Sequence, residues 1–485
     1  MSTVHSYLSS LSLHIAGEWR GISGRDTLPV INPATGAELG RLPMATERDI
    51  DDALAAAQAA FPAWSQASAW ERDRILQRAA VLIHERRDAI AHSLTLENGK
   101  PLADAQGEID RVIETITWCA EEGKRAYGRV LPPRSHRLTQ TTLKRAIGPV
   151  AAFVPWNFPM VLAARKVAAA LAAGCTVVLK PAEETPASCI ELVRAFLDAG
   201  LPPGALSLLF GVPAQVSQRL IASPVIRKIS FTGSVAVGRL LATQAAQQLK
   251  PATMELGGHA PVVVFDDVDV DKVAAACAAF KFRNAGQVCL SPSRFYVHDS
   301  IAERFAQRLA AHAQALQVGD GLTPGVQMGP LNNERRLQAA QALVDDARAA
   351  GARVLTGGQR IGTQGFFFQP TVLTQLPASA RLLKEEPFCP VAPVMSFATL
   401  DEVIALANDS DMGLAAYAFT NRLDRAAEFS ERVEAGWIGI NSFTPALADA
   451  PIAGMKDSGL GMEGGPEGLD AYLHSRFVSQ SSLAT

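Results

Sequence analysis

The sequence predicts an α/β protein with two helix-covered sheets of largely parallel strands. From about residue 145, short apolar runs such as "TVVLK" alternate with helical segments such as "SCIELVRAFLDAG". Uninterrupted apolar strands separated by such helices are typical of a parallel sheet covered on both faces. A second series begins at "APVVVFDD" and continues through "SRFYVHD" to "WIGINSF". The 485 residues exceed a single core, so about two to four domains of roughly 150 residues each are expected.

The chain ahead of the first series is expected to be helical. Thr46 and Ser68 each open a capping-box pattern, with an acidic residue three positions later and an Ala- and Leu-rich run behind it. The run after Ser68 is expected to end at "ENGKP", an Asn-Gly stop followed by proline. Another helix is expected over about 104–125.

Two segments fit neither series. Residues 125–146 contain a polar/apolar alternation, and residues 470–485 read in a similar way. Both are interpreted as exposed edge strands, and an unpaired strand edge invites a partner chain.

Composition argues against several classes of protein. The net charge is −3 and no basic stripe is visible, so no nucleic-acid partner is expected, and a charged substrate would be held by individual residues. The six cysteines form no Cys-x-x-Cys pair, and no His cluster has metal spacing, which argues against a metal site and favours a reducing, cytoplasmic location. The start of the chain does not resemble a signal peptide, and no run of 18 apolar residues predicts a membrane span.

Cys289, in "KFRNAGQVCLSPSRFYV", is the first candidate functional residue. A lone cysteine is usually a small buried hydrophobe, and an unperturbed thiol with a pKa near 8.5 is only slightly ionised at neutral pH. A helix N-terminus or a basic neighbour would increase the thiolate fraction. Pro292 indicates a bend here, and bends at strand ends expose catalytic groups.

Two other segments carry candidate catalytic groups. Asn157 stands between two prolines in "VPWNFPM", and a side-chain amide held this rigidly suits an oxyanion donor, although a plain turn Asn is the alternative. Glu255 precedes two glycines in "TMELGGHAPVVV", where a capped turn leading into a strand is the alternative.

Two segments suit a nucleotide. In "FTGSVAVG", Gly233 and Gly238 flank a strand-to-helix turn that fits a phosphate but matches neither a P-loop nor G-x-G-x-x-G. In "VVLKPAEETP", Lys180 and Glu183 follow an apolar strand, and an acidic residue in such a place can bind ribose hydroxyls.

In their order and separations, these segments resemble the NAD(P)-dependent aldehyde dehydrogenase superfamily over essentially the whole chain. The most specific matches are "PWNFP", "KPAEETP", "FTGS", "MELGG", "FRNAGQVC", "EEPFCPV" and "GMKDSGLG". The resemblance implies an aldehyde dehydrogenase fold and a homodimer or homotetramer. Its parts would be a Rossmann-like NAD-binding domain (1–124 and 147–255), an α/β catalytic domain (256–456) and a small β oligomerisation arm (125–146 and 457–485).

The resemblance also implies a mechanism. Cys289 attacks the aldehyde carbon, and the amide of Asn157 with the backbone N–H of Cys289 stabilises the oxyanion of the thiohemiacetal. Glu255 activates the water that hydrolyses the thioester formed after hydride transfer. Lys166 and Glu463 match positions that relay protons.

The cofactor is expected to be NAD rather than NADP. Lys180 and Glu183 match contacts to the adenosine ribose, where a carboxylate repels a 2′-phosphate. The other cofactor-binding positions carried over are Pro155, Trp156, Gly233, Ser234, Leu256, Glu386 and Phe388. No metal is expected.

The resemblance defines the substrate less closely than it defines the mechanism and the cofactor. Arg165 and Arg283 match arginines that hold the distal carboxylate in the succinate-semialdehyde dehydrogenase-like branch, and an Arg fork suits a carboxylate. That branch also has a serine in the loop around 444–449 and a second cysteine two residues after the nucleophile, whereas "TPALAD" has no serine and Ser291 replaces the cysteine. Leu162 and Phe443 are further substrate-binding candidates.

Succinate semialdehyde is therefore the first choice of substrate and 2-oxoglutarate semialdehyde the second. A less polar aldehyde is the competitor, suggested by Phe443, Leu447 and Ile452. A CoA-acylating enzyme is disfavoured because Glu255 is there to direct water. A non-catalytic protein that keeps the fold is disfavoured by the intact catalytic positions.

Three positions depart from the family pattern. Cys389 replaces the usual glycine and could disturb the turn that presents Phe388. His259 stands where lysine is common, and Ile452-Ala453 replaces an aromatic-containing pair.

Overall fold

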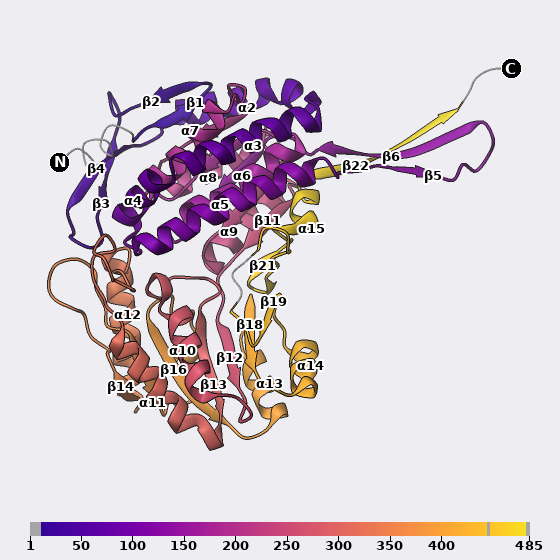
Figure 1. Ribbon diagram of the computed structural model, residues 1–485. Coiled ribbons are helices and arrows are strands. Elements are labelled where there is room, and N and C mark those ends of the chain that lie inside the picture. Colours follow the sequence, from indigo (N-terminus) through magenta and orange to yellow (C-terminus); the bar gives the residue numbers. More distant parts are fainter. Residues whose placement is uncertain (1–10, 444–446, 482–485) are drawn as a thin grey trace.

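The computed structural model describes residues 11–443 and 447–481, and part of the "TPALAD" loop, residues 444–446, lies outside this description. Two sheets dominate the molecule, one in each of two bodies that lie one above the other (Figure 1). The predicted α/β class is confirmed. The upper sheet has the strand order β2 (Glu18–Arg20), β1 (Leu13–Ile15), β9 (Leu206–Leu208), β8 (Val177–Lys180), β7 (Val150–Phe153), β10 (Lys228–Thr232), β11 (Ala252–Glu255) and β21 (Gly459–Leu460).

The five central strands of the upper sheet, in the order β9, β8, β7, β10 and β11, run parallel. At its edges, β1, β2 and β21 pair antiparallel. Successive residues of β7 face opposite sides, as a pleated strand requires. Val150 and Ala152 join one apolar core, and Ala151 and Phe153 join the other.

Helices cover both faces of this sheet, which explains why its strands are apolar throughout. One layer contains α3 (Ala69–Glu85), α4 (Arg87–Asn98), α5 (Leu102–Gly123), α6 (Pro159–Ala173) and α7 (Pro186–Asp198). The other contains α2 (Glu47–Gln66), α8 (Pro213–Ala222) and α9 (Val235–Gln247).

The predicted helix ends agree largely with the structure. Thr46 forms a full capping box with Asp49, and the Ser68 side chain accepts the N–H of Glu71. The run after Ser68 is two helices rather than one, because the chain departs from helical geometry at Arg86. Its second helix ends at the predicted Asn-Gly stop, where Gly99 is left-handed with φ of 92°.

The lower sheet has the strand order β14 (Arg353–Thr356), β15 (Thr371–Thr374), β16 (Val391–Phe397), β13 (Pro292–His298), β12 (Ala260–Val264), β18 (Ala415–Phe419) and β19 (Trp437–Ile440). Only β14 is antiparallel to its neighbour. One apolar core lies against α10 (Val270–Lys281), α11 (Asp299–Ala315) and α12 (Glu334–Ala349), and another against α13 (Leu400–Asn408) and α14 (Leu423–Arg432).

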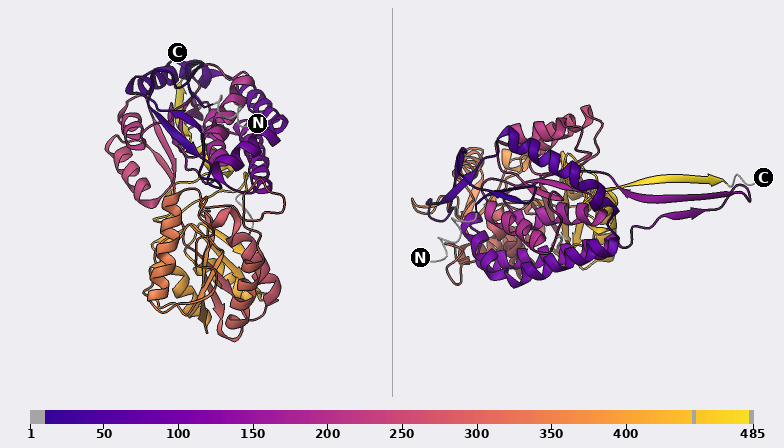
Figure 2. Two further views of the ribbon diagram at one scale, coloured as in Figure 1. Left: turned by 90° about the vertical axis from the view of Figure 1, so that its left-hand side faces the viewer. Right: turned by 90° about the horizontal axis from the view of Figure 1, so that it is seen from above.

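The two predicted edge segments pair with each other. Strands β5 (Arg129–Leu131), β6 (Leu138–Ala146) and β22 (Leu473–Ser481) form an antiparallel sheet that projects from the upper body as an arm (Figures 1 and 2). Helix α15 (Gly465–Asp470) packs at its base against α5 and α6. Two small ribbons complete the strands, β3 (Thr27–Ile31) with β4 (Glu38–Pro43) and β17 (Met412–Gly413) with β20 (Met455–Lys456). Among the described residues, no helix has the length and apolarity to cross a membrane.

Candidate active site

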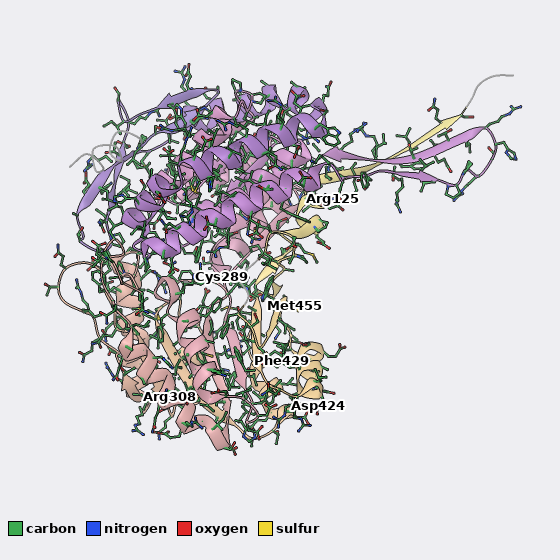
Figure 3. The ribbon with its side chains drawn as sticks, in the orientation of Figure 1. Arg125, Cys289, Arg308, Asp424, Phe429 and Met455 are labelled. Atoms are coloured by element: carbon green, nitrogen blue, oxygen red, sulfur yellow. The ribbon has the colours of Figure 1, made fainter. Side chains whose placement is uncertain are left out.

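The carboxyl ends of the upper sheet's central strands meet at one edge and bring three polar residues together. Glu255 is the last residue of β11 and pairs in register with Thr232, the last residue of β10. Asn157 follows the neighbouring strand β7. Ligands of parallel sheets bind outside such ends. Cys289 reaches the same place from the lower body, and Figure 3 shows it at the level where the two bodies meet.

The backbone that delivers Cys289 is strained. Asn284, Ala285 and Gly286, in the short 3₁₀ segment η1 (Arg283–Gly286), have φ of 48°, 53° and 72°. The left-handed conformation costs about 1–2 kcal/mol for a non-glycine residue. Only glycine fits at position 286, since a Cβ there would stand 2.2 Å from the carbonyl oxygen of Cys389.

Hydrogen bonds between side-chain amides and the backbone hold this loop. Asn284 Nδ2 donates to the carbonyl oxygen of Asn157 at 3.1 Å, and Gln287 Nε2 donates to that of Asn284 at 3.0 Å. The backbone N–H of Asn332 donates to Gln287 Oε1 at 2.9 Å. The loop that carries Cys289 is thus tied to the strand end that carries Asn157.

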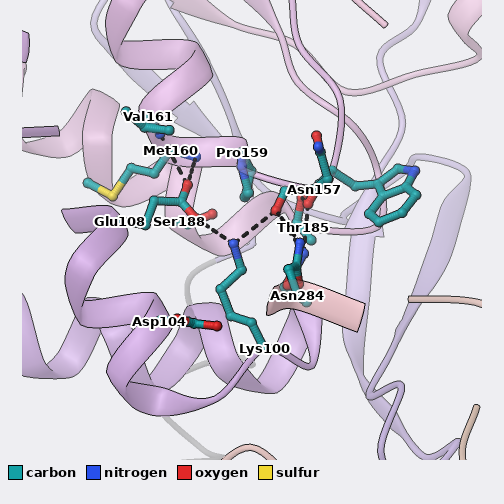
Figure 4. A network of polar contacts seen from close by, with 12 residues as sticks. Lys100, Asp104, Glu108, Asn157, Pro159, Met160, Val161, Thr185, Ser188 and Asn284 are labelled. Carbon is teal, nitrogen blue, oxygen red and sulfur yellow. Dashed lines mark hydrogen bonds and ion pairs between the residues drawn. The ribbon is translucent and has the colours of Figure 1, made fainter. Parts of the chain in front are cut away.

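A buried ion pair supports Asn157 from below (Figure 4). Lys100 Nζ lies 2.6 Å from Glu108 Oε2 and donates to the Asn157 carbonyl oxygen at 2.9 Å. Asn98 Nδ2 donates to the Trp156 carbonyl oxygen at 2.9 Å. The side-chain amide of Asn157 itself donates to the carbonyl oxygen of Gln287 at 3.1 Å, which fixes its plane and leaves its second N–H available.

Cys289 lies on two cavities at once. It lines an apolar pocket and a second, more polar cavity, and Asn157, Leu162, Thr232 and Leu256 also line both. Burial, and then the nearby carboxyl groups of Glu386 and Glu255, raise the pKa of the Cys289 thiol to about 12. Backbone N–H groups of Cys289 and Leu290 lower the pKa but do not offset burial, so the thiol requires a base.

Glu255 is a suitable base. Burial, and then the charge of Glu463, raise the pKa of the Glu255 carboxyl well above its usual range, while Lys166 and Arg165 act against this. Lys166 forms a buried ion pair with Glu463, and the Ser230 hydroxyl donates to the same Glu463 oxygen at 3.1 Å. The two residues expected to relay protons therefore lie together, within electrostatic reach of Glu255.

The polar cavity has the lining expected for a nicotinamide dinucleotide. Ser234 caps α9, so an N-terminal helix end borders the cavity, as suits a phosphate. Burial raises the pKa of Glu386 to about 7, and the N–H of Gly258 donates to its carboxyl at 3.2 Å. Seven of the expected cofactor residues line this cavity: Pro155, Trp156, Gly233, Ser234, Leu256, Glu386 and Phe388. Arg335 and Arg336 line it as well and were not predicted.

Lys180 and Glu183 lie outside that lining, at the carboxyl end of β8. Their side chains pair with each other, with Lys180 Nζ 2.7 Å from Glu183 Oε1, and the N–H of Gly211 donates to the same oxygen at 3.1 Å. The carboxylate expected to select against a 2′-phosphate is thus already partly neutralised by a lysine.

Three arginines line the apolar pocket. Arg165, on α6, donates to the carbonyl oxygen of Leu447 at 3.3 Å. Arg283 Nε lies 3.6 Å from Asp104 Oδ1, and its guanidinium sits 5.4 Å from the centre of the Phe158 ring. Arg111, on α5, also lines the pocket.

Arg111 was not anticipated from the sequence. Asp104, Glu108 and Arg111 are spaced by four and three residues, so the expected helix puts all three on one face. In the structure the first meets Arg283, the second holds Lys100, and the third enters the pocket. The polar stripe that these three residues form on one helix face is the sequence pattern that could have identified Arg111.

The other substrate candidates divide into two groups. Leu162 lines both cavities, and Ile452 lines the pocket. Phe443 lies behind the wall, because it stacks on Phe280 with ring centres 4.8 Å apart, and Phe280 is the residue that faces the pocket. Among the described residues, no group of acidic, cysteine or histidine side chains could hold a metal ion.

The departures from the family pattern are accommodated locally. Cys389 is fully buried, and the left-handed conformation falls on Phe388, with φ of 45°, rather than on Cys389. The ring of Phe388 still contacts Trp156, edge to face at 5.7 Å. His259 is buried with Nδ1 2.7 Å from Ser293 Oγ, and burial keeps the pKa of its imidazole well below the usual value.

A thiol shared by a cofactor cavity and a substrate pocket is the arrangement expected of a dehydrogenase that works through a thioester. A family model described as "Aldehyde dehydrogenase family" matches residues 19–478, and the chain belongs to this family. It is therefore an NAD(P)-dependent aldehyde dehydrogenase that acts on small aldehydes.

Individual relatives match almost the whole chain. A putative 4-(hydroxymethyl)benzenesulfonate dehydrogenase of Comamonas testosteroni is 47% identical, covering 96% of this chain and 97% of its own. A 3-sulfolactaldehyde dehydrogenase of Pseudomonas putida and a succinate-semialdehyde dehydrogenase (NADP(+)) of Escherichia coli K12 are each 43% identical, covering 96% of both chains. The crystal structure of a succinate-semialdehyde dehydrogenase from Burkholderia pseudomallei superposes with a TM-score of 0.96 at 42% identity, covering 98% of this chain and 99% of that one.

Proposed function

We propose that this aldehyde dehydrogenase oxidises an aldehyde with a distal anionic group to the carboxylic acid, with NAD and without acylating CoA. The carrying observation is the pocket beside Cys289, whose walls are apolar and whose polar lining includes Arg165 and Arg283. An apolar pocket lined in part by arginines suits a short carbon chain with an aldehyde at one end and an anion at the other.

In the proposed mechanism, the Cys289 sulfur bonds to the aldehyde carbon and its proton passes to Glu255. The carbonyl oxygen becomes an oxyanion that accepts hydrogen bonds from the free N–H of the Asn157 amide and the backbone N–H of Cys289. Bound NAD supplies the acceptor for the hydride that leaves this carbon. Such preorganised donors lower the barrier because they need no reorientation as charge develops.

Hydrolysis then uses Glu255 a second time. Glu255 first passes the proton it took from Cys289 to the Lys166–Glu463 pair. The carboxylate then takes a proton from water, the hydroxide attacks the thioester carbon, and the C–S bond breaks to release the acid and the Cys289 thiolate. We assign the Lys166–Glu463 pair to carrying the proton away, since Glu463 lines the pocket and its carboxyl also contacts Lys166 and Ser230. Two groups are needed because one must be a nucleophile and the other a base.

Among aldehydes that end in a carboxylate, succinate semialdehyde remains the first choice of substrate and 2-oxoglutarate semialdehyde the second. Three curated relatives are named for succinate semialdehyde and three for compounds that carry a sulfonate, and all of these compounds bear an anion distant from the reacting carbon. A less polar aldehyde is favoured by one observation, the apolar wall of Phe280, Leu414 and Ile452.

The test is a pair of variants, Arg165→Gln and Arg283→Gln, assayed by NADH absorbance with succinate semialdehyde and with butanal. Loss of a charge-assisted hydrogen bond should lower kcat/KM for the semialdehyde by about 10- to 100-fold. Butanal should change little in Arg283→Gln, and in Arg165→Gln only as far as the pKa of Glu255 rises. Equal losses on both substrates would contradict the anion grip. Arg74→Gln, an exposed arginine on α3, is the matched control.

The same assay with NAD and NADP tests the cofactor. We propose NAD because Glu183 stands at the carboxyl end of β8, although one relative is named for NADP and the Lys180 ion pair weakens the repulsion. A cytoplasmic location remains a prediction from cysteine usage. A homodimer or homotetramer assembled through the arm is part of the same proposal.

A further inference from the structure

Arg111 has no assigned role, although it lines the substrate pocket together with Arg165 and Arg283. Its side chain is half-buried on α5. Within the described part of the chain, its guanidinium has no hydrogen bond and no ion pair within 4.0 Å. An arginine of this kind in an apolar pocket is costly unless an anion joins it, because removing a charge from water is unfavourable.

The carboxylates nearest to Arg111 are engaged elsewhere. Asp104 lies with Arg283, at 3.6 Å. Glu108 pairs with Lys100 through one oxygen, and its other oxygen accepts the N–H groups of Met160 and Val161 at 3.0 and 3.2 Å. Glu255 and Glu463 also line the pocket and act on Arg165, but no carboxylate of the described residues lies within 4.0 Å of the Arg111 guanidinium.

The three arginines also act on one another. Burial lowers the pKa of Arg111, and the positive charges of Arg283 and Arg165 lower it further. Repulsion among cations that point into one pocket is relieved when an anion lies among them, since each attraction then acts in a medium less polar than water. The arrangement favours a ligand that can be contacted from three sides.

We propose that Arg111 is a specificity-determining residue that completes a three-arginine anion site with Arg165 and Arg283, and that the site takes an aldehyde ending in a sulfonate. This rests on the proposed oxidation of an anionic aldehyde in the same pocket. A planar carboxylate offers two oxygens and is well served by one or two guanidinium forks. A sulfonate offers three oxygens in a pyramid, so three donors approaching from three helix or loop positions can each bind one.

The experiment compares 3-sulfopropanal with succinate semialdehyde, which differ only in the acid group, and uses butanal as the uncharged reference. The wild-type enzyme should prefer the sulfonate. Arg111→Gln should lower kcat/KM for the sulfonate by about 10- to 100-fold, the loss expected for one charge-assisted hydrogen bond. The change should appear in KM rather than kcat, with a smaller loss for the carboxylate and none for butanal. Arg111→Lys should restore part of the loss, and Arg74→Gln should resemble the wild type.

Binding without turnover gives a second measurement. Propane-1-sulfonate should inhibit the wild-type enzyme more strongly than butyrate, and Arg111→Gln should abolish that difference. Thermal denaturation of each variant shows whether it is folded.

Three outcomes would overturn the inference. A wild-type preference for the carboxylate would remove the sulfonate assignment. Equal losses on all three aldehydes in Arg111→Gln would reduce Arg111 to a structural role. If the wild type oxidised butanal better than either anionic aldehyde, the proposed function would fail together with this inference. If it preferred succinate semialdehyde to 3-sulfopropanal but oxidised both better than butanal, only this inference would fail.

Discussion

At the scale of single residues, the chemistry depends on the protonation of two buried groups, the thiol of Cys289 and the carboxyl of Glu255. The pKa of the Cys289 thiol is raised to about 12, and the pKa of Glu255 is also raised, by burial and by Glu463. A base with a raised pKa is a stronger base, so Glu255 can take a proton that an exposed glutamate would leave on the sulfur. Glu255 is therefore expected to control the pH dependence of the enzyme.

The first prediction concerns that dependence. Glu255 works as a base only when deprotonated. We therefore expect kcat to be low at pH values below the raised pKa of Glu255 and to rise as the pH passes through that pKa. Glu255→Gln should lower kcat by about 10²- to 10⁴-fold and remove this rise. The measurement is a kcat–pH profile for both proteins under saturating cofactor and aldehyde.

A control separates Glu255 from its acidic neighbour. Burial raises the pKa of Glu386 to about 7, in the same pH window. Glu386→Gln should raise KM for NAD and keep the rise of kcat with pH. If instead the rise vanished in Glu386→Gln and survived in Glu255→Gln, the assignment of the base would be wrong.

At the scale of elements, strand ends were predictable and helix faces were not. Apolar runs identified the parallel strands, and the carboxyl ends of such strands meet at one edge, so Asn157, Lys180 and Gly233 could be placed near one another. Glu255 was identified through the family resemblance. Cys289 needed the family resemblance as well, because it comes from the other sheet. Arg111 escaped because a single arginine on a helix usually faces water, and its burial depends on how α5 packs.

The strained loop before Cys289 provides the second prediction. Gly286→Ala places a Cβ at φ of 72° and 2.2 Å from the Cys389 carbonyl oxygen, so the loop must shift and carry Cys289 with it. We expect a loss in kcat of about 10²-fold or more, since a displacement of about 1 Å can have that effect. The measurements are kcat and the free energy of unfolding in urea.

Gly325 supplies the matched control. Its φ is 85°, and a Cβ there would meet nothing within 4 Å. Gly325→Ala should therefore lose stability, by about 1–2 kcal/mol, and keep its kcat. Similar kcat losses in both variants would mean that strain, rather than the position of Cys289, explains the effect.

At the scale of the whole molecule, the sequence predicted the separate parts better than their arrangement. The α/β series, the Asn-Gly helix stop and the edge strands all follow from local patterns. Pairing of β6 with β22 joins residues more than 300 positions apart, for example Thr142 with Phe477, and no local pattern specifies such a register. The depth of each arginine in the pocket likewise depends on the packing of several elements.

The arm itself leads to the last prediction. Val130 on β5 and Phe477 on β22 are 81% and 56% exposed, large values for apolar side chains on a sheet with two free edges. Figure 2 shows the arm extending away from both bodies. A second copy of the chain would bury them.

Val130→Asp combined with Phe477→Asp should therefore shift the protein to a smaller assembly, raising the dissociation constant by about 30-fold or more, while thermal unfolding of the bodies changes little. Sedimentation velocity measures the assembly, and Leu423→Asp, which replaces an 88% exposed leucine at the start of α14, controls for the added charge. A wild-type chain that sediments as a monomer at micromolar concentration, or a double variant that sediments like the wild type, would show that the arm is not the interface.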